Sequence, residues 1–329
     1  MMATVARDSG EFSCPTYKEI SKSWDLNLPK ISIVSATYNQ RPYLERLLSG
    51  FVLQETVFPF EIVIRDDGSE DGSQDFLLAF QRKLPEVVRL DLLPQNTWTY
   101  LRPIQELLER AEGDFVAPCD GDDYWIGHEK LQNQADFLVT NPDVGLVHHP
   151  AQLISANGNS PAVGTRQQRA VRVPKHKPVT AIWSTAMFRK TEIPRIEVPI
   201  FTVGSGDFIT LNLVTAHSSS HFMAGAIWAV KRNVAKETDS SGVFKSLASR
   251  IVAAQLLKQM SNSRRAISLT VESFSRILDI SGLNYMEAQR ATRFALWSRR
   301  KRLVLHLFHR LWPGLSRKNL KKSDSRERL

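Results

Sequence analysis

The sequence has 329 residues, which at roughly 150 residues per domain corresponds to about two domains. Its hydrophobic fraction of 42% and charged fraction of 23% are those of a globular protein, and they exclude a disordered, collagen-like or disulfide-stapled chain. The formal net charge of +9 is unevenly distributed: residues 245–329 hold 19 Lys and Arg against 5 Asp and Glu, whereas residues 1–244 hold 24 against 29. The basic character therefore belongs to the C-terminal region and not to the body of the chain.

Residues 1–29 are polar and lack clear periodicity, so we expect an N-terminal extension. After them, short apolar runs alternate with amphipathic segments of helical period. The expected strands are 31–35, 61–65, 87–93 and 114–118, and the expected helices are 42–51, 73–84, 104–111, 131–139 and 208–214. Such alternation predicts an α/β fold with a mostly parallel sheet flanked by helices. We expect a mobile loop over 151–180 and a further strand over 181–189.

The cysteines and the N-terminus bear on the compartment of the protein. Cys14 and Cys119 form neither a CxxC pair nor a Cys/His cluster, so we predict no structural zinc site, and a reducing compartment fits. The N-terminus has no apolar run followed by a cleavage site, and no stretch approaches the roughly 18 apolar residues of a membrane span. We therefore expect a cytoplasmic protein.

Three polar clusters each follow a predicted strand: TYNQ at 37–40, DDGS at 66–69 and DGDD at 120–123. Ligands of parallel α/β sheets bind outside the carboxyl ends of the strands, so one edge of the sheet is expected to hold all three clusters. The first strand–helix junction lacks the Gly-rich sequences of dinucleotide-binding and ATP-binding loops, which argues against an oxidoreductase or a common ATPase. An acidic pocket binds a phosphate through a bridging cation, and Mg²⁺ and Mn²⁺ favour carboxylate ligands.

Each acidic cluster also has a plain structural interpretation. Residues 120–123 could form a solvated turn, whereas a calcium loop is excluded because Tyr124 and Leu131 stand at its positions 5 and 12. Residues 66–69 could form a tight turn. Asp207, in the sequence Gly-Asp-Phe, could cap a helix or act as a general base. These alternatives stay open for each cluster taken alone.

Taken together, the clusters resemble the inverting glycosyltransferases of family 2, which have the GT-A fold. The resemblance is carried by SIVSATYNQ (32–40), EIVIRDDGSEDGS (61–73), GDFVAPCDGDDYW (113–125) and KLQNQADFLVTNPDVGLV (130–147). It weakens over STAMFRK (184–190) and GSGDF (204–208) and ends before residue 245. The resemblance implies a Rossmann-like GT-A catalytic domain (30–244). Outside it, the residue patterns predict an N-terminal extension (1–29) and a basic helical C-terminal region with a disordered end (245–329).

The resemblance also implies roles for particular residues. Donor binding would involve Thr37, Tyr38 and Asn39 in the nucleotide pocket and Asp66 and Asp67 at the base and ribose.

Asp122 matches the metal ligand of the family's Asp-x-Asp motif, with Mn²⁺ or Mg²⁺ as the cofactor. Asp120 and Asp123 would contact the sugar, the ribose or metal-bound water, and Asp207 matches the catalytic base. These matches predict transfer of a sugar from a nucleotide-sugar donor to a hydroxyl of a glycan or lipid-linked acceptor, in surface polysaccharide synthesis.

The sequence departs from the family at one place. Many relatives carry Arg-x-His near the end of the catalytic domain, whereas residues 231–233 here are Lys-Arg-Asn. Arg232 could still bind the diphosphate, but a third protein ligand to the metal is left open. Trp125 and Trp183 could stack on a sugar face or could be core residues.

The C-terminal region predicts a basic amphipathic helix within residues 284–312. Trp297, Val304, Phe308 and Trp312 are spaced by 7, 4 and 4 residues and share one face among several Lys and Arg. Such a helix is typical of membrane-surface elements, so we expect peripheral attachment to an anionic membrane at the inner face of the cell membrane. The alternative is a helix packed on the catalytic domain. No nucleic-acid module is recognisable, so nucleic acid is not an expected partner.

Two other functions compete with the catalytic one. A non-catalytic relative could bind a nucleotide sugar or glycan and act through its basic C-terminal region, and an interaction protein could act through that region alone. The intact set of carboxylates favours the enzyme.

Overall fold

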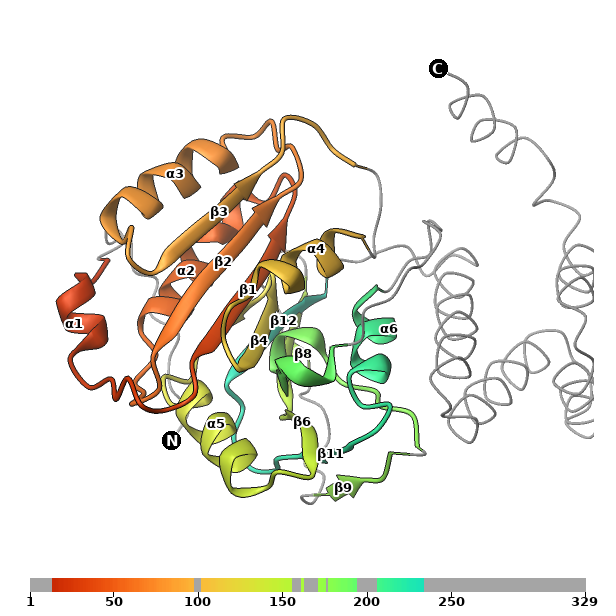
Figure 1. Ribbon diagram of the computed structural model, residues 1–329. Helices are drawn as coiled ribbons and strands as arrows, with labels where there is room; N and C mark the ends of the chain where they lie inside the picture. Colours follow the sequence, from red (N-terminus) through yellow and green to blue (C-terminus); the bar gives the residue numbers. More distant parts are fainter. Residues whose placement is uncertain are drawn as a thin grey trace, which may run out of the picture. The chain divides into compact units, whose positions relative to one another are not determined.

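The computed structural model describes residues 14–97, 102–155, 161–162, 171–175, 177–193 and 206–233. An eight-stranded sheet with the strand order β3-β2-β1-β4-β10-β6-β11-β9 runs through it (Figure 1). Its strands are β1 (Ile31–Thr37), β2 (Phe60–Asp66), β3 (Val88–Leu92), β4 (Phe115–Asp120), β6 (Val144–His148), β9 (Val171–Val173), β10 (Met187–Arg189) and β11 (Ser219–Phe222). The helices are α1 (Tyr17–Ser21), α2 (Arg41–Val52), α3 (Ser73–Lys83), α4 (Arg102–Arg110), α5 (Lys130–Thr140) and α6 (Gly206–Leu213). The predicted α/β class is confirmed.

The first four strands form the parallel part of the sheet. β1 lies at its centre, paired in parallel with β2 on one side and β4 on the other, and β3 extends the sheet beyond β2. β10 lies antiparallel between β4 and β6, and β11 runs parallel to β6. The sheet is therefore mostly parallel, as the alternation of strands and helices predicts.

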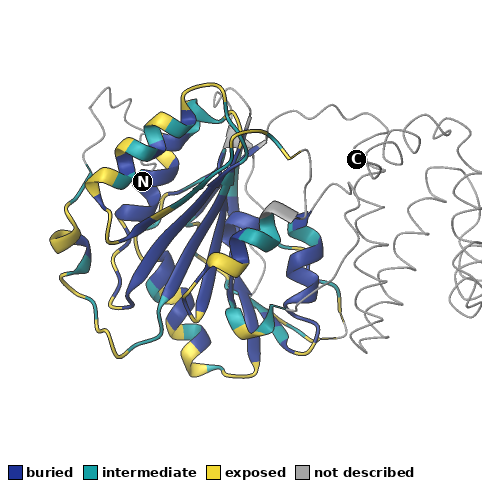
Figure 2. Cartoon of the chain, turned by 45° about the horizontal axis from the view of Figure 1, so that its top comes forward, coloured by how far each residue is buried: buried dark blue, intermediate teal, exposed yellow. Residues whose placement is uncertain are grey.

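Side chains that alternate along the strands divide the core into two clusters, one on each face. Ile33 and Ile64 belong to the cluster that contains residues of α2, α3 and α5, whereas Val34, Val63 and Val116 belong to the cluster that contains residues of α4 and α6. Strands buried on both faces are near-continuous apolar runs, which is how they read in the sequence. Figure 2 shows these strands buried beneath helices whose outer surfaces are exposed.

A second sheet has four strands in the order β5-β12-β7-β8: β5 (Tyr124–Trp125), β12 (Ala229–Asn233), β7 (Ala151–Ser155) and β8 (Pro161–Ala162). The prediction of a loop over 151–180 is therefore wrong for the segments that form β7, β8 and β9. β7 is stabilised by parallel pairing with β12, far along the chain, which no local pattern reveals. The strand expected over 181–189 is confined to β10, and a 3₁₀ turn (Trp183–Thr185) precedes it.

The expected N-terminal extension is folded onto the body from residue 14 onward. The side chain of Thr16 accepts the N–H of Glu19 and the carboxylate of Glu19 accepts the N–H of Thr16, so a capping box begins α1. Ile20 is buried, and the ring of Trp24 lies 5.0 Å from that of Phe60 on β2. This segment belongs to the core.

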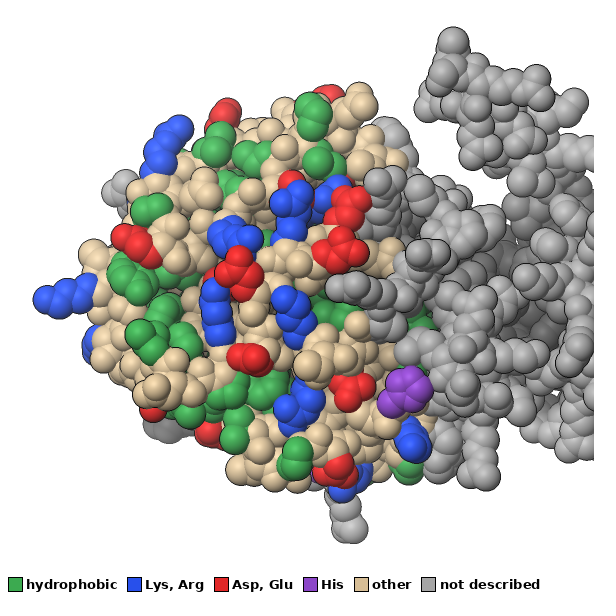
Figure 3. Space-filling view, viewed as in Figure 1, with side chains coloured by type: hydrophobic (Ala, Val, Ile, Leu, Met, Phe, Trp, Pro, Cys, Tyr) green, Lys and Arg blue, Asp and Glu red, His purple; other side chains and the backbone are tan. Residues whose placement is uncertain are grey.

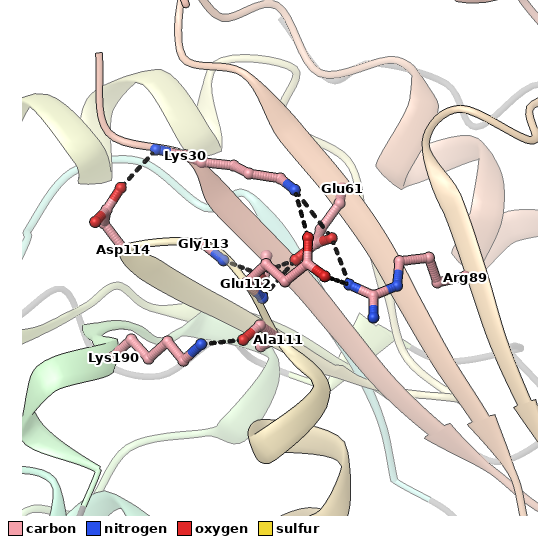
Figure 4. Close-up of polar contacts among 9 residues, drawn as sticks. Lys30, Glu61, Arg89, Ala111, Glu112, Gly113, Asp114 and Lys190 are labelled. Carbon is pink, nitrogen blue, oxygen red and sulfur yellow. Dashed lines mark hydrogen bonds and ion pairs between the residues drawn. The ribbon is translucent and has the colours of Figure 1, made fainter. Parts of the chain in front are cut away.

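The amino-terminal edge of the sheet is held by a buried carboxylate, that of Glu61 on β2. Its oxygens accept hydrogen bonds from Ser32 Oγ at 2.6 Å and from the backbone N–H of Glu112 at 2.7 Å. Lys30 Nζ lies 3.1 Å and an Arg89 guanidinium nitrogen 3.2 Å from the same side chain. Figure 4 shows Lys30, Arg89 and Glu112 around the side chain of Glu61. The cluster ties β1, β2, β3 and the segment before β4 together.

No helix in the described part of the chain is long and apolar enough to cross a membrane. Acidic and basic side chains are interspersed over the face shown in Figure 3. Residues 234–329, which include the predicted basic helix and the predicted boundary at 244–245, lie outside the described residues.

Candidate active site

Three loops meet at the carboxyl-terminal edge of the sheet because β1, β2 and β4 are parallel and in register. Thr37, the last residue of β1, lies opposite Asp66, the last residue of β2, and Ala36 lies opposite Asp120 at the end of β4. The N–H of Asp67 donates to the carbonyl of Thr37 at 3.0 Å. The three predicted clusters therefore lie together at one edge.

Asn39 joins the first loop to the second. Its φ of 51° is in the left-handed region, which Asn tolerates better than most residues. Its N–H donates to Ser69 Oγ at 2.8 Å, and its Oδ1 accepts the N–H of Glu70 at 2.9 Å. Asn39 therefore holds the first loop against the second, while the neighbouring Tyr38 leaves 36% of its surface exposed.

Asp66 and Asp67 have different surroundings. Asp66 is fully buried, and its carboxylate accepts the N–H and the hydroxyl of Ser69 and the side-chain amide of Gln74, at 2.6–2.8 Å. Asp67 is half-buried and accepts the N–H of Thr97 at 3.2 Å and its hydroxyl at 3.0 Å. Asp66 therefore supports the loop from beneath, and Asp67 lies nearer to the surface, where its contact with a base or ribose stays a prediction.

The third loop brings together carboxylate oxygens of Asp120, Asp122 and Asp123, all within 4.8 Å of one another. Asp120 and Asp122 are half-buried, whereas Asp123 is fully buried. Asp123 accepts hydrogen bonds from Ser184 Oγ and from the backbone N–H of Arg232, the latter at 2.9 Å. Burial first and then the nearby Asp120 charge raise the pKa of the Asp123 carboxyl to about 7. Asp123 is therefore the innermost carboxylate of the cluster, and Asp120 and Asp122 lie nearer to solvent.

Side chains of the first loop pack closely against Gly121 in the carboxylate loop. A Cβ on Gly121 would lie 2.2 Å from Gln40 Oε1 and 3.0 Å from Thr37 Oγ1, so glycine permits this close approach. Both of those oxygens are buried and have no hydrogen-bond partner within the described ranges. The cluster offers only oxygen ligands, the donor set that Mg²⁺ and Mn²⁺ prefer.

Lys231 on β12 contacts the carboxylate cluster, and the sequence interpretation did not assign it to the site. Its Nζ lies 2.8 Å from Asp120 Oδ2 and 3.2 Å from Asp123 Oδ2. Burial alone would lower the pKa of this ammonium, but the carboxylates of Asp120, Asp123 and Asp122 together raise it. Lys231 and Asp120 are 111 positions apart in the chain, so no local pattern indicates that they are in contact. The only signal in the sequence is the basic character of the Lys-Arg-Asn segment.

Arg232, next to Lys231, contacts the same loop. Its Nε donates to the backbone carbonyl of Asp122 at 3.2 Å, and its guanidinium carbon lies 4.5 Å from the centre of the Tyr43 ring. The side chain is buried. The structure thus places Arg232 beside the carboxylate loop, where its binding of a diphosphate stays a prediction.

Asp207 lies in the first turn of α6 and is half-buried. Burial, followed by the charge of Asp120, raises the pKa of its carboxyl, while Lys231 opposes that shift. The backbone N–H of Phe208 also donates a hydrogen bond to this carboxyl. The Asp207 side chain therefore bonds to the first turn of its own helix, and its role as a general base stays a prediction. Asp207 is therefore near enough to Asp120 and Lys231 for their charges to act on its carboxyl.

The two candidate stacking tryptophans are core residues. Trp125 and Trp183 are 3% and 4% exposed. Trp125 Nε1 donates to the carbonyl of Ser184 at 2.8 Å, and its ring packs against Phe51. Neither indole can stack on a sugar in this structure.

The parallel sheet, the carboxylate loop at the end of β4 and the small sheet that contacts this loop are the features of a GT-A glycosyltransferase fold. The chain belongs to glycosyl transferase family 2, whose family model matches residues 32–196. The predicted family and fold are thereby confirmed.

Solved glycosyltransferase structures share the fold, and two of them were determined with a nucleotide sugar. Staphylococcus aureus TarS in complex with UDP-GlcNAc has a TM-score of 0.56 at 18% identity, over 76% of this chain and 73% of that one. The mannosyltransferase PcManGT of Pyrobaculum calidifontis, in complex with GDP-Man and Mn²⁺, has a TM-score of 0.56 at 17% identity, over 87% and 88%.

Sequence relatives match a shorter segment. An uncharacterized protein of Mycobacterium tuberculosis is 34% identical over 128 residues, which are 39% of this chain and 37% of the relative. TarS, a poly(ribitol-phosphate) beta-N-acetylglucosaminyltransferase, is 34% identical over 112 residues, 33% of this chain and 19% of TarS. The chain thus matches well under half the length of these curated relatives.

Proposed function

We propose that this protein is a metal-dependent inverting glycosyltransferase that moves a sugar from a nucleotide-sugar donor to a hydroxyl of a glycan or lipid-linked acceptor. One observation carries the proposal: Asp120, Asp122 and Asp123 place their oxygens within 4.8 Å of one another, and Asp207 interacts electrostatically with Asp120. Membership of glycosyl transferase family 2 and the fold shared with TarS and PcManGT support it.

The residues of the site have distinct roles in this proposal. Asp122 and Asp120 would hold Mn²⁺ or Mg²⁺, which when bound neutralises negative charge on a diphosphate leaving group. Thr37, Tyr38 and Asp67 would contact the nucleoside from the neighbouring loops.

Asp207 would take the proton of the acceptor hydroxyl as that oxygen attacks the sugar carbon on the face opposite the diphosphate, which inverts the configuration. Its raised pKa makes it a stronger base than an ordinary carboxylate, which favours this transfer.

The proposal includes a setting for the reaction and a location for the protein. The name of TarS describes transfer of N-acetylglucosamine to poly(ribitol phosphate), and a Bacillus subtilis relative, TuaG, is named for teichuronic acid biosynthesis, so we propose synthesis of a surface polysaccharide as the setting. The basic, tryptophan-containing segment 284–312 supports peripheral attachment to an anionic membrane. Co-sedimentation with anionic liposomes tests the attachment, which should weaken as salt concentration rises.

Two substitutions at the site separate donor binding from chemistry. Asp122→Asn should abolish Mn²⁺-dependent nucleotide binding measured by calorimetry, whereas Asp207→Asn should keep that binding and lose at least about a hundredfold in transfer or donor hydrolysis. Asp75→Asn, on the exposed side of α3, is the matched control and should behave as wild type. Full turnover by both site variants, across a panel of nucleotide sugars, would show that the proposed site is wrong.

A further inference from the structure

The ammonium of Lys231 occupies the part of the site where a metal ion would need its ligands. It lies 2.8 Å from Asp120 Oδ2 and 3.2 Å from Asp123 Oδ2, and these residues with Asp122 form the oxygen cluster. The Lys231 side chain is 31% exposed, so it has room to move toward solvent. A cation that binds Asp120 must therefore compete with this ammonium for the same oxygens.

Strand pairing and hydrogen bonds fix the backbone around Lys231, and this backbone position directs its side chain to the carboxylates. β12 pairs in parallel with β7 and antiparallel with β5, the strand that follows the carboxylate loop directly. The N–H of Arg232 donates to Asp123 Oδ1, and Arg232 Nε donates to the carbonyl of Asp122. With its backbone anchored on both sides, Lys231 can exchange partners only by turning its flexible four-carbon side chain.

The charges of the site make such an exchange useful. The carboxylates of Asp120, Asp122, Asp123 and Asp207 carry four negative charges when ionised, and Lys231 is the basic side chain shown in ion pairs with two of them. A dication entering alone would meet the ammonium at close range. A dication that arrives with a nucleoside diphosphate brings phosphate oxygens with it. The Lys231 ammonium can pair with these oxygens once it leaves the carboxylates.

We propose that Lys231 is a resident counter-ion that couples metal binding to donor binding. In the donor-free protein its ammonium holds Asp120 and Asp123 and keeps divalent-cation affinity low. When a nucleoside diphosphate and its cation bind together, the ammonium transfers to the phosphate oxygens and leaves the carboxylates to the cation. Lys231 is a positioning residue for the donor complex in this proposal, which rests on the proposed metal-dependent function.

The test measures Mn²⁺ binding to the folded, full-length protein by electron paramagnetic resonance of free Mn²⁺, without and with UDP or GDP. Wild type should bind Mn²⁺ weakly alone and more tightly with one of the nucleotides. Lys231→Met should bind Mn²⁺ alone about tenfold more tightly or better, because a positive charge beside the ligand oxygens is gone. The enhancement by nucleotide should shrink by the same factor.

Controls separate this coupling from a structural role. Lys231→Arg keeps the charge and should keep the weak donor-free binding, and Lys18→Met on the exposed side of α1 should leave all affinities unchanged. Circular dichroism confirms that each variant is folded. If Lys231→Met does not fold, Lys231→Gln replaces it, and the wild-type comparison of Mn²⁺ affinity with and without nucleotide stands by itself.

Three outcomes would overturn the inference. Donor-free Mn²⁺ affinity that is unchanged or weaker in the Lys231 variants would mean that the ammonium only supports the loop. Equal Mn²⁺ affinity of wild type with and without nucleotide would remove the coupling. Either result leaves the proposed function standing, whereas no Mn²⁺ binding under any condition would overturn the metal-dependent function as well.

Discussion

The carboxylate of Glu61 gives the most quantitative prediction for stability. Glu61→Gln keeps the shape of the side chain but removes its charge from Lys30 and Arg89. One of the two acceptor oxygens becomes an amide N–H₂, which faces either Lys30 and Arg89 or the donors Ser32 Oγ and Glu112 N–H. Breaking a buried ion pair costs about 3–5 kcal/mol. Because the Lys30 and Arg89 side chains are 37% and 44% exposed and can rehydrate, we expect a loss of about 2–3 kcal/mol in the free energy of unfolding.

This loss should lower the melting temperature by roughly 4–12 °C for a domain of this size. The pH dependence has a definite sign. Burial alone would raise the pKa of Glu61, but hydrogen bonds from Ser32, Glu112 and Lys30 outweigh it and lower the pKa below the ordinary value of 4.5. The stabilisation is therefore complete above that value and is lost as the pH falls through the folded-state pKa.

The assay is urea unfolding of wild type and Glu61→Gln, followed by circular dichroism from pH 7 down to pH 3. The difference between the two proteins should be full at pH 7 and should narrow in acid. Glu112→Gln is the matched control, because Glu112 is 60% exposed and its ion pairs should contribute less than about 1 kcal/mol. A difference below about 0.5 kcal/mol at pH 7, or one that does not change with pH, would refute the reasoning.

Two other predictions concern the site loop and the core beneath it. Gly121→Ala should leave the fold intact but lower Mn²⁺–nucleotide affinity at least about tenfold in calorimetry, because the new methyl group would push Gln40 Oε1 away and crowd Thr37, one of the proposed donor-binding residues. Unchanged affinity would place the nucleotide elsewhere. Lys130 is fully buried, and burial lowers its pKa to about 7. Between about pH 7 and pH 10 the unfolded chain therefore binds more protons than the folded protein does, so the free energy of unfolding should rise with pH over that window. Lys130→Met should flatten this dependence in thermal melts, and an unchanged slope would contradict it.

Much of the sheet could be predicted because its central strands are apolar runs with helices of regular period between them. Once β1, β2 and β4 are parallel neighbours, the positions of Thr37, Asp66 and Asp120 at one edge follow from the topology. The buried role of Asp66 had a local signal as well. Ser69 follows it by three residues, and an Asp that accepts hydrogen bonds from a nearby Ser is a common way to form a turn.

The rest depends on contacts between distant residues. β7 and β12 are short strands in a region of mixed composition, and each is stabilised by the other across the chain. The ion pair between Lys231 and Asp120 follows from that pairing. Similarly, the burial of Trp125 depends on Phe51 from α2, so its sequence position next to the acidic loop gave no indication that it faces the core.

The position of β12 late in the chain has a consequence for the order in which the site is assembled during synthesis. A ribosome produces Asp120, Asp122 and Asp123 more than a hundred residues before Lys231, so a nascent chain can form β1 to β4 while the three carboxylates face each other without their cation. Like charges this close oppose formation of the loop. The ion pairs of Lys231 with the loop can form only after residues 229–233 have been synthesised and have paired between β5 and β7.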